Sequence, residues 1–471
     1  MCASAAENLQ RRWFTGGRRT KVQKEIRITL PEQVSFIINT LNQAGFEAYA
    51  VGGCVRDSIM ERTPDDWDIT TSADPQQVKE LFRRTVDTGI QHGTVTVMLQ
   101  KTGYEVTTYR IDGEYEDNRH PKEVIFTKSL EEDLKRRDFT VNAMAYHPKE
   151  GLVDLFDGIG DMERKCIRCV GCAEERFSED ALRMMRGVRF SAQFGYEIEE
   201  ETRKAIRKLK NNLRSVSAER IRVELVKLLM SPHPDYLREA YELGITKVIL
   251  PEFDVCMETP QHNPHHCYSV GEHTLEGLNL VRADKVLRLA MLLHDIGKPL
   301  TKTTDANGKD HFKKHPRESA RLANDILRRL KFDNDTLKKV CRLVEYHDWS
   351  IDLEEDVKIS TVRRLIARIG EDAFPDMFEI NRADLLSQSA YLREEKLAKQ
   401  ERLESLYREI MEKQECLSLK DLSVGGKDLL AQGMKPGKEV GNILQRMLTD
   451  VLENPAHNKK EYLLENLYLY L

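Results

Sequence analysis

The chain has 471 residues, 40% of them hydrophobic, and its 73 Lys and Arg against 78 Asp and Glu give a formal net charge of −5. This composition excludes a disordered or fibrous chain and suffices for about three domains with cores of their own. The nearly balanced charge excludes a globally basic nucleic-acid binder, so any contact with RNA must depend on local basic patches. No apolar run approaches the roughly 20 residues of a membrane span, so we expect a soluble protein without a membrane partner.

The N-terminus and the cysteines indicate where the protein works. The first 30 residues include a basic run at 11–21 but no apolar stretch like a secretory signal, so we expect a flexible basic tail, with an organelle transit peptide as the alternative. Nine cysteines are few and odd in number for this length, which predicts reduced thiols and a cytoplasmic location. Cys166, Cys169 and Cys172 have a C-x-x-C-x-x-C spacing, but a strand there would turn Cys169 away from the other two, which argues against metal or cluster binding.

The apolar pattern changes once along the chain. The first part mixes strand-like and helix-like runs, which predicts a small α+β domain, with strands at 47–51, 67–70, 94–99, 104–109 and 123–126. From residue 179 onward the period is 3.6, which predicts an elongated all-α body, with helices at 221–230, 286–293, 320–330 and 443–452. Prolines between 232 and 264 mark boundaries in that body, and the charged stretch from 393 to 404 predicts a solvated helix. We therefore divide the chain into segments 1–30, 31–165, 166–231, 232–390 and 391–471.

A glycine pair and two aspartates follow the first predicted strand. Gly52 and Gly53 precede a short helix whose free N-terminal amides suit an anion such as a triphosphate, and Arg56 lies just inside that helix as a donor to phosphate oxygens. Asp66 and Asp68 are two residues apart on a predicted strand and so project to one face, where they are able to share divalent metals. A polar turn is the alternative for either motif alone, but their combination favours a phosphoryl-transfer site.

Glu105, on a later predicted strand, is either a third carboxylate of this site or an ordinary exposed strand residue. The stretch from 134 to 142 sets Arg136 and Arg137 beside an acid and a polar pair, and a solvated basic turn is its alternative.

The segment from 179 to 189 predicts a helix on which Asp180 and Arg183 lie three residues apart and therefore on one side. A carboxylate accepts from an exocyclic amine, and a guanidinium donates to a neighbouring ring nitrogen. Cytosine and adenine both offer that edge, whereas guanine and uracil present a carbonyl beside a ring N–H. The pair therefore predicts selection of CTP and ATP, with a surface salt bridge as the alternative.

A second constellation lies in the helical body, where an apolar helix ends in the adjacent pair His294 and Asp295. Buried polar pairs need partners, and one or two divalent ions would satisfy this pair. The candidate ligands along the chain are His273, His315, His347 and Asp384.

Five segments together resemble the bacterial-type (class II) tRNA CCA-adding nucleotidyltransferases, within the polymerase-β-like nucleotidyltransferase superfamily. They are VGGCVRD at 51–57, DDWDI at 65–69, YRIDGEYEDNRHP at 109–121, RRDFTVNAMA at 136–145 and EDALRMMRGVRF at 179–190. The resemblance implies addition of C, C and A from CTP and ATP to the tRNA 3′ end with Mg²⁺. It also implies a polymerase-β-like catalytic head at 31–165, a base-recognising neck at 166–231 and a tRNA-binding tail at 391–471.

The resemblance further implies a role for individual residues. Asp66 and Asp68 would bind magnesium. Gly53, Arg56 and Arg137 would contact the nucleotide. Asp180 and Arg183 would template the base, assisted by Arg186 and Arg189. Residues 110–121 resemble the loop that switches the pocket from C to A addition, and 426–438 resembles a tail segment whose alternative is a plain helix-capping loop.

The second constellation resembles the HD phosphohydrolase superfamily, whose members hydrolyse phosphate esters with a divalent metal. This resemblance implies a metal site at His273, His294, Asp295 and Asp384 in the segment 232–390. Two alternatives to CCA addition remain: a poly(A) polymerase, which would use ATP alone, and an HD phosphohydrolase with a vestigial nucleotidyltransferase domain. A purely RNA-binding module would leave the metal-type carboxylates unexplained.

Overall fold

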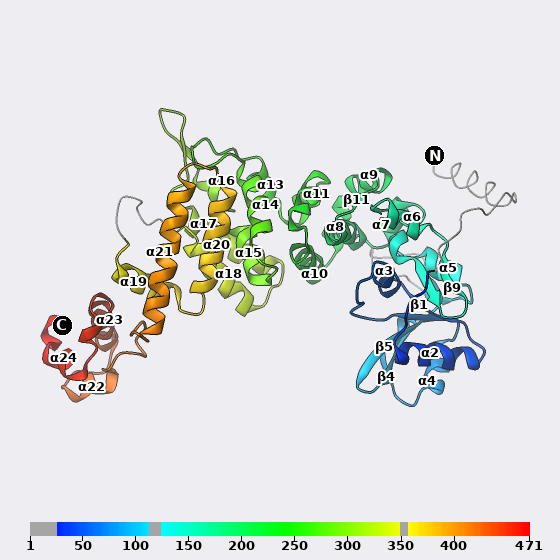
Figure 1. Ribbon diagram of the computed structural model, residues 1–471, viewed down its shortest axis with the longest axis horizontal. Coiled ribbons are helices and arrows are strands. Elements are labelled where there is room, and N and C mark those ends of the chain that lie inside the picture. The colour runs from blue at the N-terminus through cyan, green and yellow to red at the C-terminus, as the bar shows by residue number, and fades with distance from the viewer. Residues whose placement is uncertain (1–25, 113–123, 349–356) are drawn as a thin grey trace. The chain divides into compact units, whose positions relative to one another are not determined.

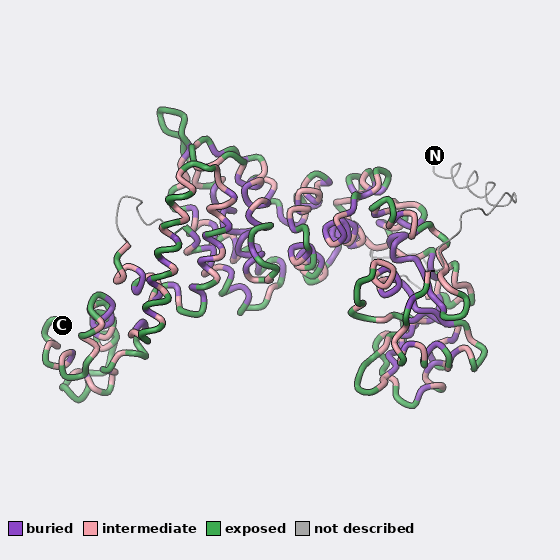
Figure 2. The backbone as a smooth tube through the Cα atoms, in the orientation of Figure 1, coloured by how far each residue is buried: buried purple, intermediate pink, exposed green. Residues whose placement is uncertain are grey.

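The computed structural model describes residues 26–112, 124–348 and 357–471 and divides the chain into two compact units, Met1–Ile249 and Leu250–Leu471. Figure 1 traces the elements of each unit, and Figure 2 shows buried residues inside both. Most of the predicted N-terminal tail, and residues 113–121 of the predicted switching loop, lie outside the described residues.

A seven-stranded mixed sheet forms the head of the first unit, in the order β3-β4-β5-β2-β1-β8-β9. Strands β2 and β5 are parallel, and the other neighbours are antiparallel. Helices α2 (Glu32–Gln43) and α4 (Pro75–Leu81) pack against this sheet, where their apolar residues and those of the central strands form one core. The strands are β1 (Ala48–Val51), β2 (Ile69–Thr71), β3 (Thr85–Gly89), β4 (Thr94–Leu99), β5 (Thr102–Thr108), β8 (Met144–His147) and β9 (Gly151–Asp154).

The predicted strands are confirmed with small shifts at their ends. One shift concerns the aspartates, because β2 begins at Ile69, so Asp66 and Asp68 lie on the segment just before the strand. A two-stranded ribbon of β6 (Arg110–Asp112) and β7 (Val124–Phe126) flanks the predicted switching loop. The short helices of this part are α3 (Gly53–Ile59), α5 (Leu130–Lys135), α6 (Gly158–Glu163) and the 3-10 turn η2 (Thr140–Asn142).

Helices follow the sheet in the first unit, and α8 (Leu182–Phe194) packs against α10 (Ala218–Leu229). The helix predicted to open at Glu179 begins later, because α7 (Ala173–Glu179) ends at that residue. Asp180 lies between the two helices, and its Oδ1 accepts a hydrogen bond from the amide of Leu182 at 3.1 Å. The remaining elements are β10 (Cys166–Ile167), β11 (Glu197–Ile198), α9 (Glu200–Leu209), η4 (Pro234–Tyr236), α11 (Leu237–Glu242) and α12 (Thr246–Ile249).

The second unit is helical, as predicted, apart from a two-residue ribbon of β12 (Thr303–Thr304) and β13 (Asp310–His311). Among the described residues, every helix is too short or too polar to cross a bilayer. The charged stretch from 393 lies in a 20-residue helix, which confirms the predicted solvated helix. The helices are α13 (Pro251–Met257), α14 (Val270–Leu280), α15 (Lys285–Leu293), α16 (Lys298–Thr301), α17 (His315–Arg329), α18 (Asn334–Tyr346), α19 (Ile359–Ile369), α20 (Phe374–Ser387), α21 (Arg393–Glu412), α22 (Gly426–Ala431), α23 (Lys438–Glu453) and α24 (Lys460–Glu465).

Candidate active site and candidate metal centre

Strand β1 leads directly into a tight turn at Gly52 and Gly53. Gly52 has a φ of 82°, and a Cβ at this position would lie 2.9 Å from Nη1 of Arg137. Only glycine satisfies both restrictions, because other residues avoid positive φ and would push the guanidinium away. The Nε of Arg137 is buried and has no hydrogen-bond partner in the described part of the chain, so a donor remains for a ligand.

Asp66, Asp68 and Glu105 approach one another at the edge of β2. The register pairs Ile69 with Val106, so Asp68 lies beside Glu105, one position before this pair. All three residues are exposed, yet partial withdrawal from water and the neighbouring carboxylates raise the pKa of Asp68 and of Glu105. The Arg137 guanidinium opposes that rise at Asp68. Carboxylates that repel one another at an accessible edge fit a divalent cation, which would relieve the repulsion.

Arg56 is buried under two aromatic rings instead of pointing freely into solvent. Its guanidinium carbon lies 4.7 Å from the centroid of Phe194, and it donates to Asn142 and, at 2.8 Å, to Asp57. Asn142 in turn donates to Asp138 at 3.2 Å. These contacts tie the start of α3 to the segment that carries Arg137.

Asp180 and Arg183 each have a strong ionic partner of their own. The carboxylate of Asp180 accepts from Arg220 of α10 at 2.7 and 3.2 Å, while Arg183 donates to Glu179 at 2.6 Å. A nucleotide base that used both side chains would therefore have to replace Arg220 and Glu179. These ion pairs are partly shielded from water, so a ligand replaces them only if its donors and acceptors match those of Asp180 and Arg183.

Arg186 and Arg189 lie on α8 in separate ion pairs. Arg186 binds Asp138 at 2.6 Å, and Arg189 binds Glu224 of α10 at 2.6 Å. Burial opposes the charged form of Asp138, but Arg186 and Arg183 lower its pKa to about 2. This carboxylate therefore fixes α8 to the segment that holds Asn142.

In the second unit, helices α14, α17 and α20 and the C-terminal ends of α15 and α18 bring the predicted metal ligands together. His273 (α14), His294, Asp295 and Asp384 (α20) offer ligand atoms within 4.8 Å of one another, and Asp295, His315 and His347 form a second such group. Asp295 belongs to both groups. Its Oδ2 lies 3.2 Å from His294 Nε2 and its Oδ1 lies 3.2 Å from His315 Nε2, so the two groups meet at one bridging carboxylate.

The orientation of the imidazoles fits metal binding. His294, His315 and His347 each donate Nδ1–H to a backbone carbonyl at 2.7, 2.9 and 2.7 Å, so Nε2 is the ring nitrogen that a neutral form offers to a metal. Their Nε2 lone pairs then point inward, and those of His315 and His347 face each other at 3.2 Å. Because facing lone pairs repel, a cation between them accounts for the arrangement. Burial opposes protonation of His294, yet Asp295 and Asp384 raise its pKa to about 10, so positive charge is favoured at this ring, and a divalent metal on Nε2 would supply it in place of a proton.

The three cysteines of the C-x-x-C-x-x-C spacing lie in different surroundings. Cys169 is buried while Cys166 and Cys172 are half-buried, and β10 includes only Cys166, so the three do not share one strand.

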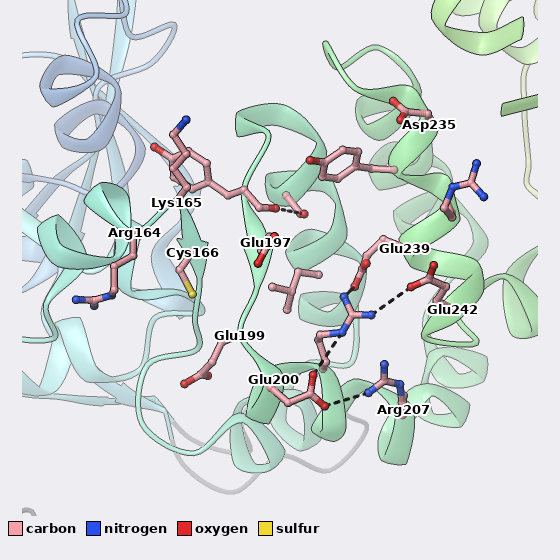
Figure 3. Close-up of a pocket in the computed structure, with 16 residues that line it drawn as sticks. Arg164, Lys165, Cys166, Glu197, Glu199, Glu200, Arg207, Asp235, Glu239 and Glu242 are labelled. Carbon is pink, nitrogen blue, oxygen red and sulfur yellow. Dashed lines mark hydrogen bonds and ion pairs between the residues drawn. The ribbon is translucent and has the colours of Figure 1, made fainter. Parts of the chain in front are cut away.

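In the first unit, a cavity of about 760 Å³ lies among β10, β11, α9 and α11 (Figure 3). It holds none of the predicted site residues, and Arg203 on its wall is paired with Glu239 and Glu242.

Sequence reasoning included Asn142 only within the stretch from 134 to 142, and it missed Asp133 and Arg220. Asp133 is fully buried and accepts from Arg136 at 2.7 Å, and it lies 3.6 Å from Arg137. An acid inside the basic run from 133 to 137 was an available signal for it. Arg220 carried no signal, because its partner is 40 residues away.

Models of three protein families match the chain. They are described as "Poly A polymerase head domain" at residues 48–168, as an "RNA and SrmB- binding site of polymerase A" at 195–257 and as "tRNA nucleotidyltransferase domain 2" at 317–467.

The relatives have a common name. A "CCA-adding enzyme" of Ligilactobacillus salivarius is 35% identical over 440 residues, which cover 91% of this chain and 94% of that protein. One of Lactiplantibacillus plantarum is 56% identical over 198 residues, 42% of this chain, and here the match spans about half (49%) of the relative's length. Among solved structures, a CCA-adding enzyme of Bacillus stearothermophilus in complex with CTP is 28% identical, with a TM-score of 0.71 over 94% of this chain and 98% of that one.

Proposed function

The chain belongs to the family of CCA-adding enzymes, and we propose that it is a template-independent tRNA nucleotidyltransferase that adds C, C and A from CTP and ATP to the tRNA 3′ end. The observation that carries the proposal is the convergence of Asp66, Asp68 and Glu105 beside Arg137, next to the Gly52 turn. A poly(A) polymerase would use the same carboxylates and remains the alternative.

In the proposed reaction the 3′-hydroxyl oxygen of the RNA forms a bond to the α-phosphorus of the nucleotide. The bond from that phosphorus to the pyrophosphate oxygen breaks and pyrophosphate leaves. The proton of the hydroxyl group passes to solvent. Asp66 and Asp68 would hold Mg²⁺, which supplies charge neutralisation at the triphosphate and at the attacking oxygen. Glu105 is the third carboxylate of this site, and Gly53, Arg56 and Arg137 bind the nucleotide.

Base choice is assigned to Asp180 and Arg183. The base displaces Arg220 from Asp180 and Glu179 from Arg183, so a base with the wrong edge leaves both ion pairs in place and gains nothing. Arg186 and Arg189 support this pocket from the same helix. The tRNA contacts are assigned to the segment 391–471, where α22 and α23 begin after glycines, and a tRNA substrate agrees with the expected cytoplasmic location.

The nucleotide requirement tests the proposal. A tRNA that lacks its last three nucleotides is incubated with Mg²⁺ and one nucleotide at a time. CTP alone is expected to add two residues and ATP alone none. A long ladder from ATP alone would favour the poly(A) polymerase and contradict CCA addition.

We also propose that the second unit contains an HD-type metal centre with phosphohydrolase activity. The two ligand groups that share Asp295 support it, with His273, His294 and Asp384 in one group and His315 and His347 in the other. A bound divalent metal would supply activation of water for attack on phosphorus. Protein loaded with Mn²⁺ is expected to hydrolyse a 2′,3′-cyclic phosphate or a phosphomonoester, and complete inactivity with several transition metals would contradict this part.

A further inference from the structure

The metal-ligand cluster of the second unit opens to solvent on one side. The side chains of His273, His294, Asp295 and His347 are 0–2% exposed and that of His315 is 9% exposed, whereas Asp384 is the most exposed at 18%. Asp384 is therefore the ligand of the cluster that a substrate in solvent reaches most readily. The residues around this carboxylate are candidates to bind the part of the substrate that the metal does not.

Two cations from the first turn of α21 lie on that side. Gln388 donates to Asp384 at 2.9 Å, and its Oε1 accepts from Lys396 Nζ at 2.8 Å. Arg393 donates to the backbone carbonyl of Gln388 at 2.5 Å. Burial lowers the pKa of Lys396, Asp384 opposes that shift and Arg393 adds to it, so both of these charges lie near the ammonium group.

Neither cation has a carboxylate partner at hydrogen-bond or ion-pair distance in the described ranges, 26–112, 124–348 and 357–471. Lys396 donates to two neutral acceptors, Gln388 and the Nδ1 of His265 at 3.0 Å, and an ammonium has a third N–H. The Nε of Arg393 is buried and has no hydrogen-bond partner among the residues that the structure describes. By contrast, Lys413 at the other end of the same helix is paired with Glu409 at 2.6 Å.

Two half-buried like charges are costly when neither contacts a carboxylate directly, and Asp384 reaches Lys396 only through Gln388. A bound anion would relieve this cost. An ammonium beside a guanidinium matches the non-bridging oxygens of a phosphate group. We propose that Lys396 and Arg393 form the phosphate-binding rim of the HD-type centre and hold the phosphate of a phosphomonoester or cyclic phosphodiester while the metal site acts on it. This inference rests on the proposed phosphohydrolase and adds two positioning residues to it.

The test is a titration of inorganic phosphate into protein loaded with Co²⁺, followed through the visible absorption of Co²⁺ on histidine ligands. His294→Ala protein serves as the blank that removes the signal of this centre. Lys396→Gln and Arg393→Gln are each expected to bind the same amount of Co²⁺ as the wild type but to raise the Kd for phosphate about tenfold, since each removes one charge-assisted hydrogen bond. Lys413→Gln is the matched control and should leave the Kd unchanged.

The possible failures are distinguishable. An unchanged Kd in both variants, with normal Co²⁺ content, would overturn the rim while leaving the metal centre intact. Loss of Co²⁺ from both variants would also overturn it, because the residues would then support the fold of the centre. A wild-type protein without the histidine-bound Co²⁺ absorption would contradict the proposed metal centre itself, and the rim with it.

Discussion

Asp66 and Asp68 hold negative charge at an exposed edge of the head, where Glu105 adds to it. Removal of Asp66 takes away a proposed Mg²⁺ ligand without touching the core. We expect Asp66→Ala to lower nucleotide addition by about a thousandfold or more, because a metal supplies several kcal/mol of charge stabilisation in phosphoryl transfer. Incorporation of labelled CMP into tRNA measures it.

The adjacent Asp65 is equally exposed and serves as the control, since Asp65→Ala removes one charge from the same segment. Normal turnover by Asp66→Ala, with its circular dichroism spectrum unchanged, would contradict the metal assignment.

The proposed base selection depends on the side chain of Asp180. Asp180→Ala removes the acceptor for the exocyclic amine, so the ratio of kcat/KM for CTP and ATP to that for UTP and GTP is expected to fall about tenfold or more. Glu175→Ala, an exposed change on α7, is the control. Unchanged selectivity in steady-state kinetics with the four nucleotides would exclude the templating role.

At the scale of elements, the turn between β1 and α3 places Arg137. Gly52→Ala puts a methyl group against the guanidinium, while Gly151→Ala, also at positive φ (83°), meets no atom within 4 Å. Both changes should destabilise the protein by about 1–2 kcal/mol through backbone strain. Only Gly52→Ala is expected to raise the KM for CTP. Equal KM values for the two variants would mean that this turn does not position the nucleotide contact.

Asp138 joins the segment before η2 to α8, and its ion pair makes that junction sensitive to pH. Its folded pKa of about 2 lies below the usual value near 4, so the stabilisation is full above about pH 4 and is lost as the pH falls toward 2. Asp138→Asn should lower the free energy of unfolding at pH 7 by about 2 kcal/mol and flatten its acid dependence.

Urea unfolding at several pH values measures this effect. Asp87→Asn breaks an exposed pair with Lys79 and is the control. A steep fall in stability between pH 4 and 2 that persists in Asp138→Asn would place the acid-sensitive group elsewhere.

Local pattern predicted much of this architecture. The apolar pattern located β4 at its observed bounds and β1, β2, β5 and β7 within two residues, because strands bury apolar side chains, but it did not predict β3, β8 or β9. It failed where the outcome depends on distant residues. The sequence spacing placed Asp180 beside Arg183 on one helix, but Asp180 precedes α8 and takes Arg220 as its partner. Likewise, spacing named His315 and His347 as candidates without revealing that Asp295 joins them to His294.

At the scale of the whole molecule, the two proposed sites draw their residues from different units. The nucleotidyltransferase residues lie within Met1–Ile249 and the HD-type ligands within Leu250–Leu471. We therefore expect the activities to be separable in the full chain. His294→Ala should abolish phosphate-ester hydrolysis and leave CMP incorporation within about twofold, and Asp66→Ala should do the reverse. Both activities are assayed in each variant. Loss of both activities from either variant would contradict independent sites.

The length of the product on tRNA tests the central claim most directly. A tRNA without its 3′ CCA is incubated with the protein, Mg²⁺, CTP and ATP, and its products are separated at single-nucleotide resolution. CCA addition predicts growth by three nucleotides, two C and one A, followed by arrest. Continued growth beyond three, or no growth at all, would contradict it.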